Sequence, residues 1–283
     1  MSNLKHVVIK TIAGRARTLR PAAFRSRPSG YTLTPEANLL PGLDAALIME
    51  DYATGDGGEL RGDVPKFCAA HSSAALAANA FGPFRRDPRL LSVGGIDGLT
   101  GARFERPLRT GLPGNPPNLD FYAAGPSGVV AVESKFTEVL EAKEAVFAAS
   151  YKRAVARLAE VAWARLYKSI VADPKQFVYL DAAQLIKHYL GIRYSLGAIE
   201  GPKVLLYAYW EPSNAGGIPE YAAHRAEVAA FASAVSGSEV RFVPVSYPGL
   251  WASWAMLPSW RGAQAHVAAL RARYDVELPS TPG

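Results

Sequence analysis

The sequence is short of cysteine and of long apolar runs, and each shortage excludes a class of protein. Cys68 is the one cysteine among 283 residues, so the chain can form neither an internal disulfide nor a thiolate zinc cluster. No stretch approaches the roughly 20 continuous apolar residues that cross a bilayer, and the N-terminus lacks the apolar segment of a secretory signal. We therefore expect a cytoplasmic protein with no membrane span.

Acidic residues are missing from the start of the chain, where none precedes Glu36. This stretch holds seven basic residues: Lys5, Lys10, Arg15, Arg17, Arg20, Arg25 and Arg27. We interpret residues 1–36 as a basic N-terminal arm that either lies along phosphates or forms a disordered or loosely packed tail. An organellar transit peptide is less favoured because the stretch shows little helical amphipathicity. The formal net charge of +6 suits a polyanionic partner such as nucleic acid.

The remaining residues, 37–283, have the composition of a single globular domain. Hydrophobic residues make up 49% of the chain and charged residues 20%, which is enough for one large core. One long helix, or two in sequence, is predicted from 138 to about 170. Further helices are predicted at 67–81, 181–191, 219–235 and 262–274. Strands are predicted within 90–101 and at 102–108, 119–124, 129–136, 204–210 and 240–245. This alternation predicts an α/β fold with a mixed sheet.

The most informative segment is a predicted β-hairpin, in which the apolar runs LDFYAA and VVAVESKF flank a turn at residues 125–128. Side chains alternate along a strand, so Glu133 and Lys135 point the same way. Asp120 lies on the opposite face of its strand from Leu119 and Phe121, so correct pairing brings it beside Glu133. Two carboxylates and an ammonium therefore converge at one end of the hairpin.

Such a trio has the groups that phosphodiester hydrolysis requires. Asp120 and Glu133 are candidate ligands of Mg²⁺, a cation that takes only one or two protein carboxylates and keeps several waters. Lys135 is the candidate that orients the attacking water or stabilises the developing negative charge. We therefore predict Mg²⁺ as the cofactor, with Mn²⁺ as a substitute.

A purely structural explanation of the charged residues also stays open, namely an ion pair on a half-exposed hairpin. Glu141 and Lys143 repeat the Glu-x-Lys spacing in a segment with a helical pattern, where residues two apart do not face each other, so we expect them to be ordinary surface. Two other functions also stay open. A non-catalytic nucleic-acid-binding protein would use the trio to contact phosphate, although bare carboxylates repel phosphate. A glycosidase would use the paired carboxylates and give Lys135 no role.

The residues N-L-D-F at 118–121 and E-S-K-F-T-E at 133–138 resemble the motif of the PD-(D/E)XK nuclease superfamily. The resemblance covers roughly residues 65–210, with F-G-P-F at 81–84 upstream and a glutamine-containing helix downstream, as in a bacterial branch of restriction-endonuclease-like proteins. The chain departs from the motif in that Leu119, not proline, precedes Asp120.

The resemblance implies a restriction-endonuclease-like αβββαβ core, with a mixed central sheet flanked by helices, and Mg²⁺-dependent cleavage of nucleic acid. It implies metal ligands at Asp120 and Glu133, catalysis by Lys135, and a further acidic ligand at Glu105. Gln184 resembles a glutamine that some relatives place on a helix beside the active site. We therefore predict a metal-dependent endodeoxyribonuclease that acts on duplex DNA, and a homodimer stays open because cleavage of both strands needs two sites.

Weaker candidates lie outside the trio. His188 follows Gln184 by four residues and would share its helical face, where it either contacts the site or belongs to an exposed polar surface. The five histidines lack zinc-ligand spacing. Trp251, Trp254 and Trp260 fit aromatic core packing better than base stacking.

Overall fold

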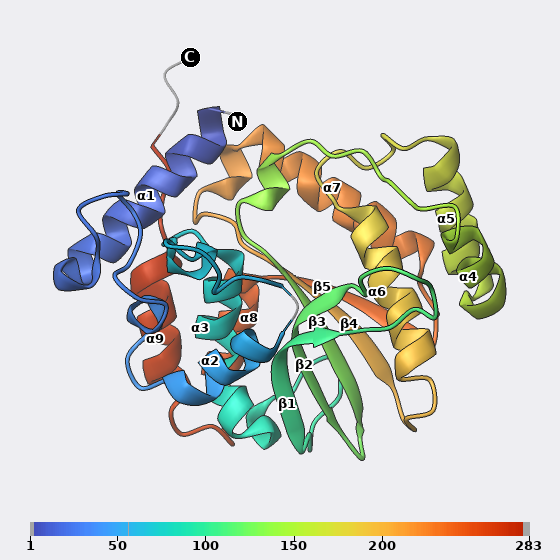
Figure 1. Ribbon diagram of the computed structural model, residues 1–283, viewed down its shortest axis with the longest axis horizontal. Helices are drawn as coiled ribbons and strands as arrows, with labels where there is room; N and C mark the ends of the chain where they lie inside the picture. The colour runs from blue at the N-terminus through green and yellow to red at the C-terminus, as the bar shows by residue number, and fades with distance from the viewer. Residues whose placement is uncertain (1–2, 56, 280–283) are drawn as a thin grey trace.

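The fold is an α/β arrangement in which helices cover both sides of one five-stranded sheet (Figure 1). The computed structural model describes residues 3–55 and 57–279. Within these residues, every helix is too short or too polar to span a bilayer. The predicted mixed sheet with flanking helices is confirmed.

The strands follow one another across the sheet in chain order. They are β1 (Gly101–Pro107), β2 (Asn118–Gly125), β3 (Gly128–Lys135), β4 (Lys203–Tyr209) and β5 (Val240–Ser246). The first three form an antiparallel meander, and β3, β4 and β5 run parallel to one another. The parallel crossovers place helical segments between β3 and β4 and between β4 and β5, as parallel connections require. The predicted hairpin is thus the β2–β3 pair.

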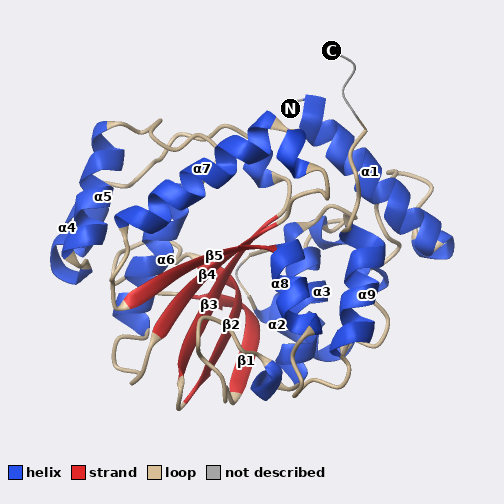
Figure 2. Cartoon of the chain, turned by 180° about the vertical axis from the view of Figure 1, so that it is seen from behind, coloured by secondary structure: helices blue, strands red, loops and turns tan. Residues whose placement is uncertain are grey.

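The helices form two groups on either side of the sheet (Figure 2). One group comprises α1 (Asn3–Leu19), α2 (Ala45–Thr54), α3 (Ser73–Arg86), α8 (Tyr247–Ala255) and α9 (Ala263–Tyr274). The other comprises α4 (Tyr151–Leu158), α5 (Val161–Ala172), α6 (Ala182–Ser195) and α7 (Pro219–Ala234). Both groups bury apolar side chains against the sheet, and the tryptophans Trp251, Trp254 and Trp260 lie in this core as expected.

Successive side chains of the hairpin strands point to opposite faces of the sheet, so they contact different helix groups. Phe121 stacks on Phe81 of α3, with ring centroids 5.0 Å apart, and Ser134 exchanges a 2.7 Å hydrogen bond with the Tyr247 hydroxyl of α8. Glu133 and Lys135, on the other face, meet α6 instead. The site residues therefore project between the sheet and α6.

Three predictions about the extent of helices and strands are wrong. The helix predicted to stop at Gly82 and Pro83 continues to Arg86, and His266 Nε2 lies 3.3 Å from the Ala80 carbonyl in the turn that the proline disturbs. The strand predicted within 90–101 is instead a 3₁₀ turn and one isolated bridge, because Gly94 and Gly95 take positive φ. The helix predicted from residue 138 begins only with α4.

The N-terminal region is not a loose tail, so that interpretation is wrong for its described residues. Val8, Ile12 and Ala16 line one face of α1 at helical spacing and are buried. The helix packs against α9, where Arg15 Nε donates a 2.6 Å hydrogen bond to the Ala272 carbonyl. The sequence pattern did not reveal this face because apolar residues also lie outside it, at Val7 and Ile9.

Candidate active site

The hairpin brings Asp120 beside the Glu133 strand, as its alternation predicts. Phe121 pairs with Val132, and the next step of this register faces Asp120 toward Glu133. The Asp120 carboxylate is partly buried and accepts a 2.6 Å hydrogen bond from the backbone N–H of Ser134. This bond fixes the carboxylate at the end of the antiparallel pairing.

Glu133 lies at the centre of the cluster and is only 1% exposed. One of its carboxylate oxygens lies 2.5 Å from Lys135 Nζ, and the other lies 2.7 Å from His188 Nε2. The histidine contact has the distance of an ion pair but not the alignment of a hydrogen bond, because Glu133 Oε2 and His188 Nε2 have no aligned partner. His188 is fully buried, so the alternative of an exposed polar face is wrong for it.

Helix α6 holds both charged residues of the Glu-x-Lys triplet through one face. Gln184 Oε1 accepts a 2.8 Å hydrogen bond from Lys135 Nζ, and His188 reaches Glu133 one turn later. Asp181 caps the helix by accepting a 3.0 Å bond from the Gln184 backbone N–H, at the start of the helix predicted over 181–191. Gln184 is therefore placed by the helix start and aimed at Lys135.

The burial of these charges shifts their pKa values in opposite directions. Burial and then the charge of Glu133 raise the pKa of Asp120 well above its ordinary value. Burial also favours a raised pKa for Glu133, but Lys135 and His188 oppose it and lower that pKa to about 2. Burial lowers the pKa of Lys135, but the charges of Glu133, Glu138 and Asp120 outweigh burial and raise this pKa above its ordinary value. Lys135 therefore stays charged. Glu133 is therefore ionised at neutral pH, whereas burial and the Glu133 charge both oppose ionisation of Asp120.

Glu138 joins the site although the sequence did not single it out. Its carboxylate accepts a 2.8 Å hydrogen bond from the Phe136 backbone N–H and interacts with Lys135 and the Ser73 hydroxyl. Burial favours a raised pKa for Glu138, but Lys135 and these hydrogen bonds lower it. The sequence could have indicated Glu138, because it follows Lys135 by three residues and lies just after the end of β3.

Glu105 lies on β1 at the register position opposite Asp120, between the pairs formed by Phe104 and Arg106. Its backbone has a φ of 49°, a left-handed conformation that interrupts the strand, and it is 5% exposed. A Cβ at Gly55 would lie 2.5 Å from the Glu105 Cβ, so the glycine allows the chain to pass close to this residue. Among residues 3–55 and 57–279, no three His, Cys, Asp or Glu side chains form a metal-binding group. Glu105 acts on Asp120 through its charge, which adds to the raised pKa.

The second Glu-x-Lys triplet, at Glu141 and Lys143, lacks the strand setting and the deep burial of the first. Glu141 and Lys143 lie in an extended loop, so their predicted helical setting is wrong. The Lys143 ammonium lies 3.1 Å from Asp181, and Glu141 pairs with Lys5 at 2.7 Å. Both pairs are partly exposed, which fits the surface role expected of them.

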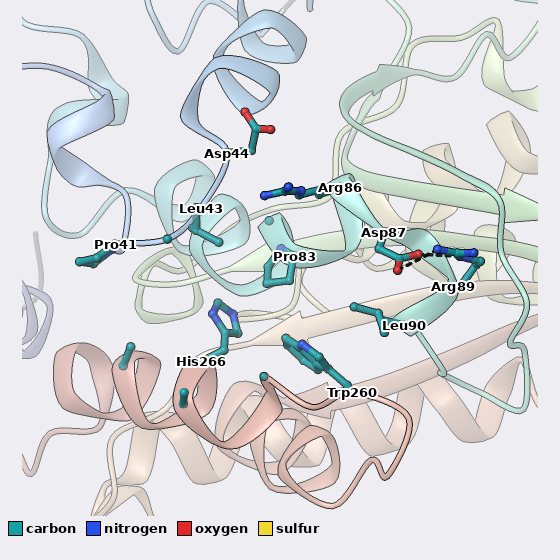
Figure 3. A pocket seen from close by; sticks show the side chains of 15 residues that line it. Pro41, Leu43, Asp44, Pro83, Arg86, Asp87, Arg89, Leu90, Trp260 and His266 are labelled. Carbon is teal, nitrogen blue, oxygen red and sulfur yellow. Dashed lines mark hydrogen bonds and ion pairs between the residues drawn. The ribbon is translucent and has the colours of Figure 1, made fainter.

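A cavity of about 540 Å³ lies elsewhere, at the C-terminal end of α3 (Figure 3). Trp260 and His266 line it. Its carboxylates are already engaged, because Asp44 caps α2 and Asp87 forms a 2.8 Å ion pair with Arg89. None of the predicted site residues lines this cavity. The carboxylates with displaced pKa values therefore favour the hairpin as the candidate active site.

The comparisons with known proteins agree with a nuclease-like assignment. The model of a family described as "Restriction Endonuclease associating with ARP" matches residues 47–275, more than half of the chain. A search of curated proteins and a search of solved structures each found no match. The matched residues include β1, the whole hairpin and α6, and hence every predicted site residue. The chain belongs to this restriction-endonuclease family.

Proposed function

We propose that the protein is a Mg²⁺-dependent endodeoxyribonuclease of the PD-(D/E)XK kind, with its active site at Asp120, Glu133 and Lys135. The observation that carries the proposal is the convergence of two carboxylates and a lysine at one end of the β2–β3 hairpin, in a chain of a restriction-endonuclease family. The order α3, β1, β2, β3, α6, β4 supports the αβββαβ core that this assignment implies.

The donor set suits a hard divalent cation. Asp120 and Glu133 supply carboxylate oxygens, and Glu133 Oε2 is buried without an aligned hydrogen-bond donor. Their mutual repulsion, which raises the pKa of Asp120, is relieved when a cation lies between them. A site with two protein carboxylates is sufficient for Mg²⁺, and Mn²⁺ has similar ligand preferences. When bound, such an ion supplies Lewis-acid activation and charge neutralisation at the phosphate.

Lys135 provides the second positive charge of the proposed site. Its ammonium is held between Glu133 Oε1 and Gln184 Oε1, at 2.5 Å and 2.8 Å, so its position is fixed before substrate binds. An ammonium has three donors, which leaves one for a water or a phosphate oxygen. Gln184 and His188 act by holding Lys135 and Glu133 in place. Glu105 is proposed as an additional acidic contributor through its charge on Asp120.

DNA is the proposed substrate because the matched family is described as a restriction endonuclease and the chain carries a net charge of +6. Duplex DNA fits both observations. The paired, buried carboxylates speak against a binding protein without catalysis, because uncompensated carboxylates repel phosphate.

The experiment that tests the proposal is cleavage of plasmid and genomic DNA, which together sample many sequences, in Mg²⁺ or Mn²⁺. We expect the wild type to cut in either metal and to stop in EDTA, and Lys135→Ala to lose about 10²–10³-fold in rate. Lys175→Ala removes an exposed lysine paired with Glu144, and it is the control that should retain wild-type cleavage. Cleavage by Lys135→Ala at the wild-type rate, or undiminished cutting in EDTA, would show the mechanism to be wrong.

A further inference from the structure

Helices α4 and α5 carry an unneutralised basic surface on the outer side of the molecule, beyond α6 (Figure 1). We define this α4–α5 basic surface by five exposed residues: Lys152, Arg153, Arg157, Arg165 and Lys168. In the part of the chain that the structure describes, their side chains form no hydrogen bond or ion pair. Their charges are thus available to an external partner.

The acidic residues nearby do not neutralise this surface. Glu160 is the one acid between Glu144 and Asp173, and its side chain turns toward the body of the protein. One of its oxygens accepts a 3.0 Å hydrogen bond from the Glu239 backbone N–H, and the other lies 3.3 Å from the Tyr189 hydroxyl. The outer faces of the two helices therefore present positive charge only.

The basic surface is fixed to the helix that lines the active site. Trp163 of α5 is buried and stacks on Tyr189 of α6, with centroids 4.0 Å apart and planes 6° apart. Lys187 of α6 lies over the Tyr151 ring at the start of α4, with its Nζ 5.7 Å from the ring centroid. Because Gln184 on the same α6 contacts Lys135, the surface and the site share one rigid support.

A second contact joins this surface to the loop that leads into β2 and Asp120. A Cβ at Gly111 would lie 2.7 Å from Arg157 Nη2 and 2.6 Å from the Tyr194 ring, so both side chains abut the β1–β2 loop. The loop residues and Tyr194 line a cavity of about 450 Å³, and the exposed Arg109 adds another cation there. Positive charge thus continues from α4 to the loop before the strand of Asp120.

We infer that the α4–α5 basic surface binds the phosphate backbone of duplex DNA beside the candidate active site. The identity of the ligand rests on the proposed nuclease function, while the surface itself rests on the unpaired cations and their link to α6. Evenly spaced phosphates are the partner that a row of guanidinium and ammonium groups fits, and such contacts release counterions.

The test is fluorescence anisotropy with a labelled duplex of about 30 base pairs, titrated at several salt concentrations in EDTA so that no cleavage occurs. The test variant is K152Q/R153Q/R157Q/R165Q/K168Q. The matched control removes five exposed cations that also lack side-chain partners within the described residues: K10Q/R27Q/R241Q/R261Q/R271Q. Both variants lose the same net charge, so any difference reports location.

If three of the five residues contact phosphates, the slope of log affinity against log salt should fall by about 2.7, and affinity near 0.1 M salt should fall more than about 100-fold. The control should stay within about threefold of wild type. Equal losses in both variants, or no binding of duplex by folded wild type, would overturn the inference. Binding to phosphatidylserine vesicles in place of DNA, lost in the test variant, would also overturn it and assign the surface to a membrane.

Folding and function are separated by two further measurements. If the five-fold variant does not melt like wild type, K152Q/R153Q and R165Q/K168Q are tested separately, and each should weaken binding about tenfold. Duplex cleavage in Mg²⁺ is measured on the same wild-type sample. A wild type that binds through this surface but never cleaves would overturn the nuclease proposal and leave the DNA-binding inference standing.

Discussion

Two regions of the chain are rich in basic residues, and they differ in how many of these side chains are bonded to the protein itself. In the N-terminal region, arginines bond to backbone carbonyls of the protein itself: Arg20 donates to Leu39 at 2.7 Å and Arg25 donates to Thr32 at 3.0 Å. In the α4–α5 basic surface, the described side chains have no such partner. A charge count therefore locates cations along the chain but does not say which of them are free to bind a partner.

The difference follows from what each region packs against. Helix α1 lies on α9, and the segment after it crosses the surface with carbonyls that need donors, which the arginines supply. Helix carbonyls accept mainly from N–H groups of the same helix, and the Leu158 carbonyl at the end of α4 accepts a 3.3 Å bond from Arg193 of α6. Helices α4 and α5 bury their apolar faces, which include Val155 and Trp163. Helical geometry then turns the remaining cations to solvent.

The largest expected effect is on the cleavage rate, and it distinguishes a catalytic defect from a defect in DNA binding. Glu133→Gln should reduce cleavage by about 10³-fold, because the mutation removes one proposed metal ligand and the partner of Lys135. Saturating DNA should not restore this variant, but it should restore cleavage by an α4–α5 variant, whose defect lies in binding. Single-turnover rates across a range of DNA concentrations measure the contrast. Recovery of Glu133→Gln at high DNA would contradict the assigned role.

A smaller effect on duplex affinity should distinguish two residues within the α4–α5 basic surface. Arg157 lies next to the β1–β2 loop, whereas Lys168 lies farther along α5, so R157Q should weaken duplex binding more than K168Q. We expect about tenfold for R157Q and about threefold for K168Q near 0.1 M salt. Anisotropy titrations in EDTA provide both values. The reverse order would place the DNA path away from the loop.

The N-terminal region should show the opposite behaviour. Arg20→Ala and Arg25→Ala each remove hydrogen bonds to backbone carbonyls, and each should lower the free energy of unfolding by about 1–2 kcal/mol. Duplex affinity should not change beyond the small effect of one charge. Urea unfolding and anisotropy on the same samples test this. A large loss of affinity with unchanged stability would make the arm a phosphate-binding element after all.

The smallest effect concerns pH and the metal-free protein. The raised pKa of Asp120 means that its contribution to stability is present below the ordinary carboxyl pKa of about 4 and is lost as pH rises through the folded value. Asp120→Asn should therefore raise the melting temperature near pH 8 in EDTA. The pKa of Glu133, lowered to about 2, gives the opposite sign, with stability lost only as pH falls toward that value. Glu133→Gln should thus lower the melting temperature at pH 8, and a rise there would contradict the charge assignment.

Much of the site could be predicted because its signals are local. Period-two alternation and turn residues define the hairpin, and they bring Asp120 to Glu133 and Lys135 without knowledge of the rest of the chain. Gln184 was found through resemblance, and the helix start at Asp181 places it against Lys135. The roles of these residues stay predictions, whereas their proximity is observed.

The remainder depends on contacts distant in sequence. The extended course of residues 141–150 arises because Lys143 and Ala145 bond to the Val178 and Pro174 carbonyls, which overrides a helical composition. The burial of His188 depends on α6 lying over Glu133, which periodicity cannot show. Helix α1 was missed because its narrow apolar face becomes evident only against α9.

The measurement that tests the central claim most directly is anomalous scattering from a crystal soaked in Mn²⁺. The account predicts a peak bonded to both Asp120 and Glu133 at roughly 2.0–2.3 Å, with the Lys135 ammonium beside it. Asp120→Asn crystals soaked identically should lose the peak. A wild-type crystal in which Glu133 stays paired with Lys135 and His188, and no metal binds at saturating Mn²⁺, would contradict the proposed active site.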